Sequence, residues 1–220
     1  MSRRLWRLVL PAALTAATAC GGAARTAAEQ GPVGAAPSGA DAADESALIP
    51  AGYGSLRQDD IAVRMALQGV QVKSIPLDES IIRTLSPDSY RALRDLKESR
   101  RAEVAALAQR SGAQQYDLWY VSFFAVAPAA RFSPMEFIVT SNGRDFRPLN
   151  LLPLTPGFGG QRLKVREVQS AVYIFDAALD SSQPLTVRVE TVQNDDWGAI
   201  LRRIELERAA IRSRVQRARG

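Results

Sequence analysis

The stretch of sequence that decides the fold is DLWYVSFFAV, residues 117–126. Side chains of a strand point alternately to the two faces of a sheet, and here both alternating sets are apolar. One set contains Trp119 and Phe123, and the other contains Tyr120 and Phe124. A strand that is apolar on both faces is covered by packing layers on both sides. Residues 117–126 therefore predict a central strand inside the body.

Further strands are predicted on both sides of this stretch. Residues 135–140 and 144–149 flank Asn142-Gly143, a dipeptide that accepts positive φ and favours a tight hairpin turn. The other alternating or apolar segments are residues 62–67, 70–72, 161–166, 171–175 and 185–191. Roughly seven short strands predict a mainly β fold, an antiparallel β-sandwich. On strand spacing alone, the body resembles the immunoglobulin-like sandwiches of bacterial surface lipoproteins.

Two helices are predicted in addition to the strands. Residues 86–88 read Ser-Pro-Asp, which is typical of a helix start, and an inserted helix is expected over about residues 86–111. Charged residues at 98–101 interrupt its apolar stripe, so one helix with a polar middle and two shorter helices both fit. A C-terminal helix is expected over about residues 195–218. The chain has no strand–helix repeat, which argues against a parallel α/β fold.

The N-terminus has the form of an export signal. Residues 1–7 are positively charged, and residues 8–19 are almost entirely apolar or small. This apolar run is too short for a membrane-spanning helix, which needs ~20 residues, but it matches the core of a signal peptide. Residues 17–22 then read Ala-Thr-Ala-Cys-Gly-Gly, so that Cys20 directly follows small residues.

With these features, residues 1–22 resemble the lipobox-type signal peptide of bacterial lipoproteins, with Ala17 in place of the usual leucine. The resemblance implies cleavage before Cys20 and lipidation of its thiol. It also implies an exported protein that is anchored to a membrane. A glycine after the cysteine, here Gly21, resembles the class of lipoproteins that are sorted to the outer membrane, where the protein would face the periplasm or the surface. An ordinary signal peptide that leaves a free thiol is the alternative, and a twin-arginine export signal at residues 2–6 is also open.

The segment after the cysteine is predicted to be a flexible tether. Residues 21–46 are mostly small, polar or acidic, and Val33 is their only large apolar residue. Such a segment cannot bury enough apolar surface to offset the entropy lost on ordering. The expected organisation is a signal peptide at 1–19, a lipidated tether at 20–47, a β-sandwich domain with its helical insertion at 48–193, and a basic amphipathic helix at 194–220.

Composition excludes several classes of chemistry. The chain has no histidine and a single cysteine, so an internal disulfide and the nucleophile pairs that need an imidazole base are excluded. Zinc favours imidazole and thiolate ligands, and neither a metal nor a cofactor is expected. The formal net charge is +5, but basic residues concentrate at the two ends, and residues 20–199 carry a net −3. A slightly acidic body argues against nucleic-acid binding.

The C-terminal segment combines an apolar stripe with many arginines. Its apolar residues recur at helical spacing from Trp197 to Val215. The arginines proposed to contact a partner or an anionic surface are Arg202, Arg203, Arg208, Arg212 and Arg214. Three interpretations stay open: docking on the sandwich with a solvated basic face, a helix–helix contact with a protein partner, and contact with an anionic envelope surface. Docking is expected for the first half of the helix.

Three other features could carry chemistry, each with a simpler structural explanation. Carboxylates that lie on or beside predicted strands could form a hydrolytic pair, or they could be outward charges; they are Glu136, Asp145, Glu167, Asp176 and Glu190. The many aromatic residues could line a ligand cavity or form the core. The loop at residues 153–160 does not lead into a helix, unlike a phosphate-binding loop, and is expected to be a long turn around Phe158.

The function expected from the sequence is that of a non-enzymatic cell-envelope lipoprotein that binds or scaffolds another envelope component. Its membrane contact would be the lipid on Cys20, and a second contact would involve the C-terminal helix. A small-molecule or glycan-binding module is the first alternative, and a carboxylate-dependent hydrolase is the second.

Overall fold

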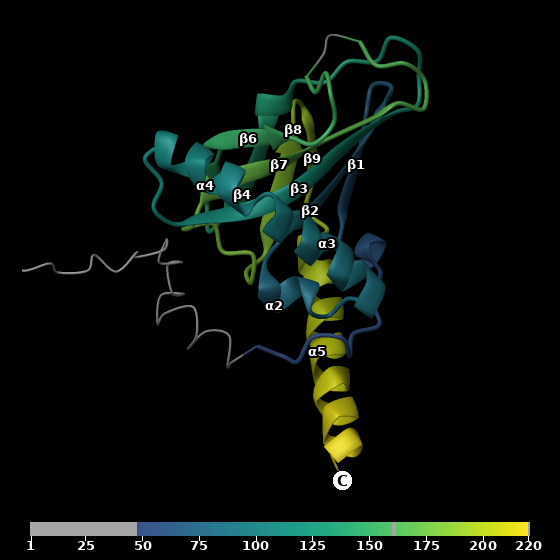
Figure 1. Cartoon of the computed structure of the whole chain (residues 1–220). Helices are drawn as coiled ribbons and strands as arrows, with labels where there is room; N and C mark the ends of the chain where they lie inside the picture. Colours follow the sequence, from purple (N-terminus) through teal and green to yellow (C-terminus); the bar gives the residue numbers. More distant parts are fainter. Residues whose placement is uncertain (1–47, 160–161, 220) are drawn as a thin grey trace, which may run out of the picture.

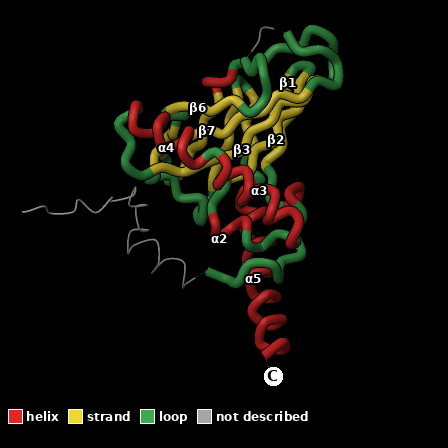
Figure 2. Tube along the Cα trace, in the orientation of Figure 1, coloured by secondary structure: helices red, strands yellow, loops and turns green. Residues whose placement is uncertain are grey.

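The computed structural model describes residues 48–159 and 162–219 (Figure 1). The predicted signal peptide, the lipidation site at Cys20 and the tether at 20–47 lie outside the described residues. The described chain forms two antiparallel sheets, a set of short helices and one long C-terminal helix (Figures 1 and 2). The predicted antiparallel β-sandwich with a helical insertion and a C-terminal helix is confirmed, while the immunoglobulin likeness stays a prediction.

The larger sheet has five strands in the order β1-β2-β3-β7-β6, and the smaller has four in the order β5-β4-β8-β9. The strand predicted to be central, β3, occupies the middle of the larger sheet. The first sheet contains β1 (Val63–Leu67), β2 (Val70–Pro76), β3 (Tyr116–Ala125), β6 (Asn150–Pro153) and β7 (Val168–Asp176). The second contains β4 (Phe137–Ser141), β5 (Arg144–Phe146), β8 (Leu185–Val189) and β9 (Val192–Asn194).

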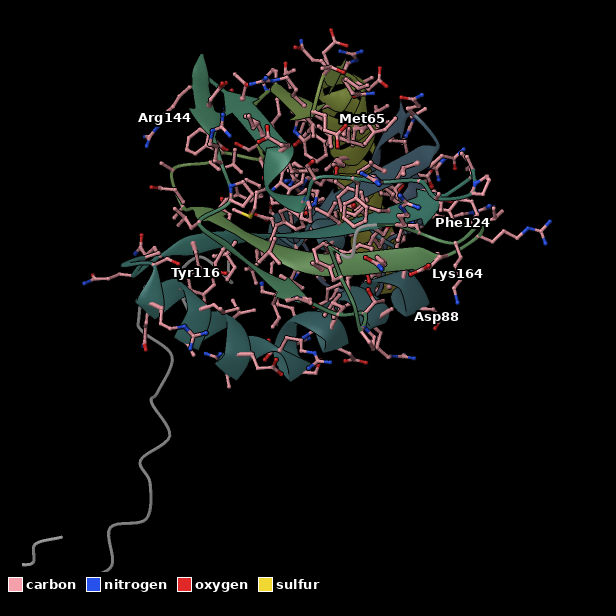
Figure 3. All side chains as sticks on the ribbon, turned by 90° about the horizontal axis from the view of Figure 1, so that it is seen from above. Met65, Asp88, Tyr116, Phe124, Arg144 and Lys164 are labelled. Carbon is pink, nitrogen blue, oxygen red and sulfur yellow. The ribbon has the colours of Figure 1, made fainter. Side chains whose placement is uncertain are left out.

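Helices cover the face of the larger sheet that is turned away from the smaller one (Figure 3). They are α2 (Glu79–Ile82), α3 (Pro87–Ser99) and α4 (Arg101–Arg110), all inserted between β2 and β3. The helical conformation is interrupted between α3 and α4 at Arg100, where φ is −107°. The insertion therefore contains two main helices rather than one. Tyr90, Leu93, Val104 and Ala108 are the buried residues of these two helices. The strand β3 is thus covered on both faces, as its sequence predicts.

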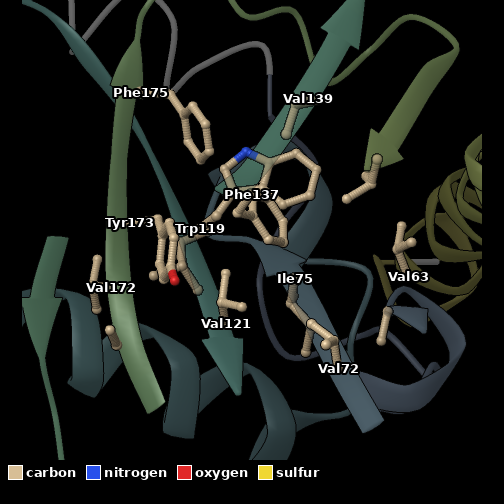
Figure 4. Packing of buried hydrophobic residues seen from close by; sticks show 14 of the residues in the cluster. Val63, Val72, Ile75, Trp119, Val121, Phe137, Val139, Val172, Tyr173 and Phe175 are labelled. Atoms are coloured by element: carbon tan, nitrogen blue, oxygen red, sulfur yellow. The ribbon is translucent and has the colours of Figure 1, made fainter. Parts of the chain in front are cut away.

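Aromatic side chains fill the space between the two sheets (Figure 4). Trp119, Phe137, Tyr173 and Phe175 are all fully buried. The ring of Trp119 lies 6.3 Å from that of Phe137 and 6.2 Å from that of Phe175, both in edge arrangements that aromatic pairs favour. These residues form the core of the sandwich.

Turns explain where the strand predictions succeed and fail. Asn142 and Gly143 have φ values of 50° and 75° and form the predicted turn between β4 and β5. The strand predicted over residues 161–166 is wrong for its described part, residues 162–166: only Leu163 makes an isolated bridge there, to Ala130, and Arg166 has a φ of 65°. The short strands β6 and β9 are additional to those predicted. Two short 3₁₀ turns occur at Gln58–Asp60 and Pro134–Glu136.

Candidate functional site: the base of the sandwich

The C-terminal helix α5 (Trp197–Arg219) docks on the body through its apolar stripe. Trp197, Ile204 and Ile211 are fully buried, and the indole nitrogen of Trp197 donates to the carbonyl oxygen of Ser181 at 3.1 Å. Docking was expected for the first half of the helix, and the buried stripe continues past that half to Ile211. The helix starts beside the sheets and runs away from them toward the C-terminus (Figures 1 and 2). We call this end of the molecule the base.

Arg203 and Arg208 of α5 both bind backbone carbonyls of the body. The guanidinium of Arg203 donates to the carbonyl oxygen of Asp60 at 2.6 Å. Arg208 donates from two nitrogens to the carbonyl oxygen of Ser80, at 2.7 and 3.2 Å. Ser80 belongs to α2, so Arg208 fixes α5 against the helical insertion. Charge-assisted hydrogen bonds of this kind are stronger than neutral ones.

An ion pair between the buried carboxylate of Glu207 and the partly exposed Arg214 joins α5 to the segment where the described chain begins. Glu207 accepts hydrogen bonds from the backbone nitrogen of Ser55 at 2.8 Å and from its hydroxyl at 2.9 Å. Arg214 donates to Glu207 at 2.7 Å and to the carbonyl oxygen of Tyr53 at 2.6 Å. Burial works against the charge of Glu207, but hydrogen bonds from Arg214 and Ser55 outweigh it and lower the pKa of this carboxyl.

Of the five arginines predicted to contact a partner, three thus contact the protein itself: Arg203, Arg208 and Arg214. The other two, Arg202 and Arg212, are exposed and make no hydrogen bond or ion pair with any described residue. Leu206 lies between them in sequence and is 74% exposed, more than any other large apolar side chain in the described ranges. Arg202, Leu206 and Arg212 constitute the outward face of α5.

A cleft of about 760 Å³ opens beside α2. Leu48, at the start of the described chain, lines it, together with residues of α2, α3, α4 and the beginning of β3. Its charged lining residues are Asp78, Glu79, Arg83, Arg94, Lys97, Glu98, Arg101 and Asp117. We call it the basal cleft. Its lining mixes both signs of charge, and it would suit a polar ligand better than an apolar one.

Glu79 organises one part of the basal cleft. Its carboxylate accepts from Arg83 at 3.1 Å and from the Tyr90 hydroxyl at 3.3 Å, and it lies 3.7 Å from the Lys97 amine. Arg94 in turn donates to the Tyr90 hydroxyl at 3.3 Å. This network ties α2 to α3 and keeps the cleft wall in place.

Asp117 is a carboxyl of the basal cleft whose pKa lies well above its ordinary value. It is the second residue of β3 and pairs with Phe175 of β7 through the backbone, but its side chain makes no hydrogen bond or ion pair with any residue of the described ranges. Burial raises the pKa of Asp117 to about 7, and the negative charges of Asp78 and Asp180 act in the same direction. A carboxyl with this pKa exchanges its proton near neutral pH. Sequence reasoning missed this group, because Asp117 is only the polar first residue of the predicted central strand and its burial depends on residues far along the chain.

The carboxylates proposed from sequence do not line this cleft. Asp176 accepts from the backbone nitrogen of Ala178, and Glu190 accepts from that of Ser133, so both hold turns. Glu167 likewise accepts from the backbone of Lys164. On the smaller sheet, Asp145 accepts from the Thr140 hydroxyl and pairs with Arg188. Glu136 is exposed.

The loop at residues 153–160 is a packed turn. The ring of Phe158 lies 5.6 Å from that of Phe132 and 6.1 Å from that of Phe123. In the described structure, these rings and the buried aromatic residues between the sheets therefore form the hydrophobic core and do not line a ligand cavity.

Comparison of the chain with known protein families, with curated proteins and with solved structures finds no match. Within residues 48–159 and 162–219, no helix has the length and the apolar character needed to cross a membrane. The same residues contain no group of three or more side chains suited to hold a metal ion.

Proposed function

We propose that the protein is a non-enzymatic lipoprotein of the bacterial cell envelope that binds or scaffolds another envelope component. It would be exported, anchored through a lipid on Cys20 to the outer membrane, and would face the periplasm or the surface. The basis for the anchor is the resemblance of residues 1–22 to lipoprotein signal peptides.

One observation links that anchor to the C-terminal helix. The described chain begins at the base, where Arg83 donates to the carbonyl oxygen of Ile49 and Arg214 to that of Tyr53. Only 27 residues separate Cys20 from Leu48, and a flexible chain of this length spans ~25–30 Å. The lipid and the outward face of α5 would therefore lie at the same end, so that Arg202 and Arg212 could reach an anionic membrane surface or a partner beside it.

The anchor is tested by changing the lipidation site. Cys20→Ala is expected to release the protein from membranes, and globomycin is expected to block processing of the wild type. A wild-type protein recovered in the soluble fraction would refute the anchor.

The second contact is tested with variants of the outward face of α5. Arg202→Gln with Leu206→Ser and Arg212→Gln removes the exposed cations and the exposed leucine while leaving the docked residues in place. We expect this variant to lose a partner that crosslinks to the wild type in intact envelopes. A control with Arg91→Gln and Arg147→Gln, two exposed arginines on other parts of the body, should keep it. An identical crosslinking pattern for all three proteins would reject this role of α5.

A second candidate function is binding of a small polar molecule in the basal cleft. The supporting observation is Asp117, a half-buried carboxyl without a bonding partner among the described residues, in a cleft that also holds Lys97 and Arg101. Screening polar metabolites by thermal shift against the wild type and Asp117→Asn tests it. A ligand of the cleft should stabilise the wild type and lose its effect, or its pH dependence, in the variant.

A further inference from the structure

Half-exposed valines gather at the end of the sandwich opposite the base. Val126, Val165 and Val168 are 48%, 49% and 48% exposed. Backbone hydrogen bonds join their segments, because Ala125 accepts from the nitrogen of Arg166 at 2.8 Å and donates to Glu167 at 2.9 Å. We call residues 126–136 and 162–168 the distal tip; Figure 1 shows these loops at the opposite end from the C-terminus of α5.

Four cations belong to the same two loops as these valines. Arg131, Arg162, Lys164 and Arg166 are all exposed, and none makes a side-chain hydrogen bond or an ion pair with another described residue. The bridge between Ala130 and Leu163 places Arg131 opposite Arg162, and like charges placed opposite each other are destabilising. An external anion between them would relieve this repulsion.

The acidic group that is closest in sequence does not neutralise these cations. Glu167 accepts hydrogen bonds from the backbone nitrogen of Lys164 at 2.8 Å and from the Gln169 side chain at 2.9 Å. These contacts lower the pKa of the Glu167 carboxyl and use its oxygens to hold the loop. The tip therefore has more positive than negative charge, although residues 20–199 as a whole are net negative.

The two loops of the tip are held by a cluster of packed aromatic rings. The rings of Phe123 and Phe132 stack at 3.8 Å, and Phe158 packs against both. Gly159 donates its backbone nitrogen to the side-chain oxygen of Gln169 at 3.1 Å. The valines and cations are thus presented on an ordered surface, at the end of the molecule where Figure 3 labels Phe124 and Lys164.

We propose that the distal tip binds the surface of an anionic lipid bilayer. The cations would contact lipid phosphates, each contributing attraction near a negatively charged surface, while the valines would enter the interface and lose contact with water. A hydrated acidic polymer would satisfy the cations but would leave the valines in water, which favours the bilayer. This surface is separate from the base, and the inference does not depend on lipidation of Cys20 or on the outward face of α5.

The experiment uses the single cysteine of the chain. In full-length protein with Cys20→Ala, Val165→Cys is labelled with an environment-sensitive fluorophore, and Leu206→Cys and Arg144→Cys are labelled in the same way as controls on α5 and on the opposite end of the smaller sheet. We expect vesicles of phosphatidylcholine with phosphatidylglycerol to shift the emission of the Val165 probe to the blue. A quencher attached to the lipid should quench it. Vesicles of phosphatidylcholine alone should change nothing, and the Arg144 probe should not respond.

A charge variant gives the second readout. Arg162→Gln with Lys164→Gln should weaken the response of the Val165 probe to anionic vesicles roughly 10- to 30-fold in lipid concentration. The control Arg91→Gln with Arg147→Gln should stay within about twofold. An unchanged Val165 probe on vesicle-bound protein, or equal responses from the Arg144 probe, would overturn the proposal. A shift with soluble polyglutamate and none with vesicles would overturn it too, in favour of an acidic polymer. A response from the Leu206 probe alone would place the contact on α5 and leave the proposed function standing.

Discussion

At the base of the sandwich, Arg203, Arg208 and Arg214 bind groups of the same chain, whereas at the distal tip the cations have no partner among the described residues. Arg208 donates twice to the carbonyl oxygen of Ser80, and Arg214 binds both Glu207 and Tyr53. At the tip, Arg131 and Arg162 lie opposite each other without an acid between them. A basic residue that stabilises the fold cannot be told from one that is available for a partner by its position on a helix or a loop. The groups that surround the basic residue in the folded chain decide which of the two roles it has.

The largest effect is expected for the ion pair of Glu207 and Arg214 at the base. Glu207→Ala removes the acceptor of Ser55 and Arg214 and leaves both donors, the second of them a guanidinium, without this carboxylate. We expect a loss of about 3 kcal/mol in the free energy of unfolding, measured by urea denaturation. Glu205→Ala, two positions away at an exposed pair with Arg208, is the matched control and should cost about 0.5 kcal/mol or less. Equal costs for the two variants would show that α5 is not held at the base as described.

A pH-dependent effect is expected for Asp117. Its pKa in the folded protein, about 7, is raised above its value in the unfolded chain, so the folded state binds more protons between about pH 4 and pH 7. The contribution of Asp117 to stability is therefore greatest below pH 4 and is lost as the pH rises through 7. Asp117→Asn should be more stable than the wild type by about 2 kcal/mol at pH 8, and the difference should shrink at pH 4.5. A difference that does not vary with pH would contradict the raised pKa.

The contrast between docked and outward arginines can be tested within α5. Arg208→Ala should cost about 1 kcal/mol, because the carbonyl of Ser80 loses a charge-assisted donor. Arg212→Ala, one helical turn further on, should change stability by less than about 0.5 kcal/mol. Thermal denaturation of the two variants side by side measures the difference. If Arg212→Ala were the more damaging substitution, the assignment of docked and outward faces would be wrong.

Periodicity was sufficient to predict the architecture. The two apolar faces of residues 117–126 correspond to the two layers that cover β3, and Asn142-Gly143 forms the turn that its φ preferences require. The strand predicted at 161–166 was wrong because the alternation of basic residues with Leu163 and Val165 there does not reflect burial on one face. Arg166 instead turns the chain with a positive φ. Strand β6 was missed because it is only four residues long and ends in Pro153.

The candidate sites were harder to predict, because they depend on contacts between distant segments. Whether an arginine of α5 docks depends on the carbonyls of Tyr53, Asp60 and Ser80, more than 100 positions away in sequence. The raised pKa of Asp117 depends first on its burial and then on the charges of Asp78 and Asp180, and only the fold produces both conditions. The lipidation of Cys20 is the reverse case: it depends on a local motif and stays a prediction from sequence.

The smallest effect on stability is expected at the distal tip, and it is the one that most directly tests the contrast between the two ends. Arg162→Gln with Lys164→Gln removes two cations that bind nothing within the described chain, and it relieves the repulsion between Arg162 and Arg131. The free energy of unfolding should change by less than about 0.5 kcal/mol, with stabilisation as the expected sign. Raising the salt concentration should shrink the difference, since screening weakens the repulsion in the wild type. A loss above 1 kcal/mol would mean that these cations serve the fold, as those of the base do, and that the tip is not free to bind a bilayer.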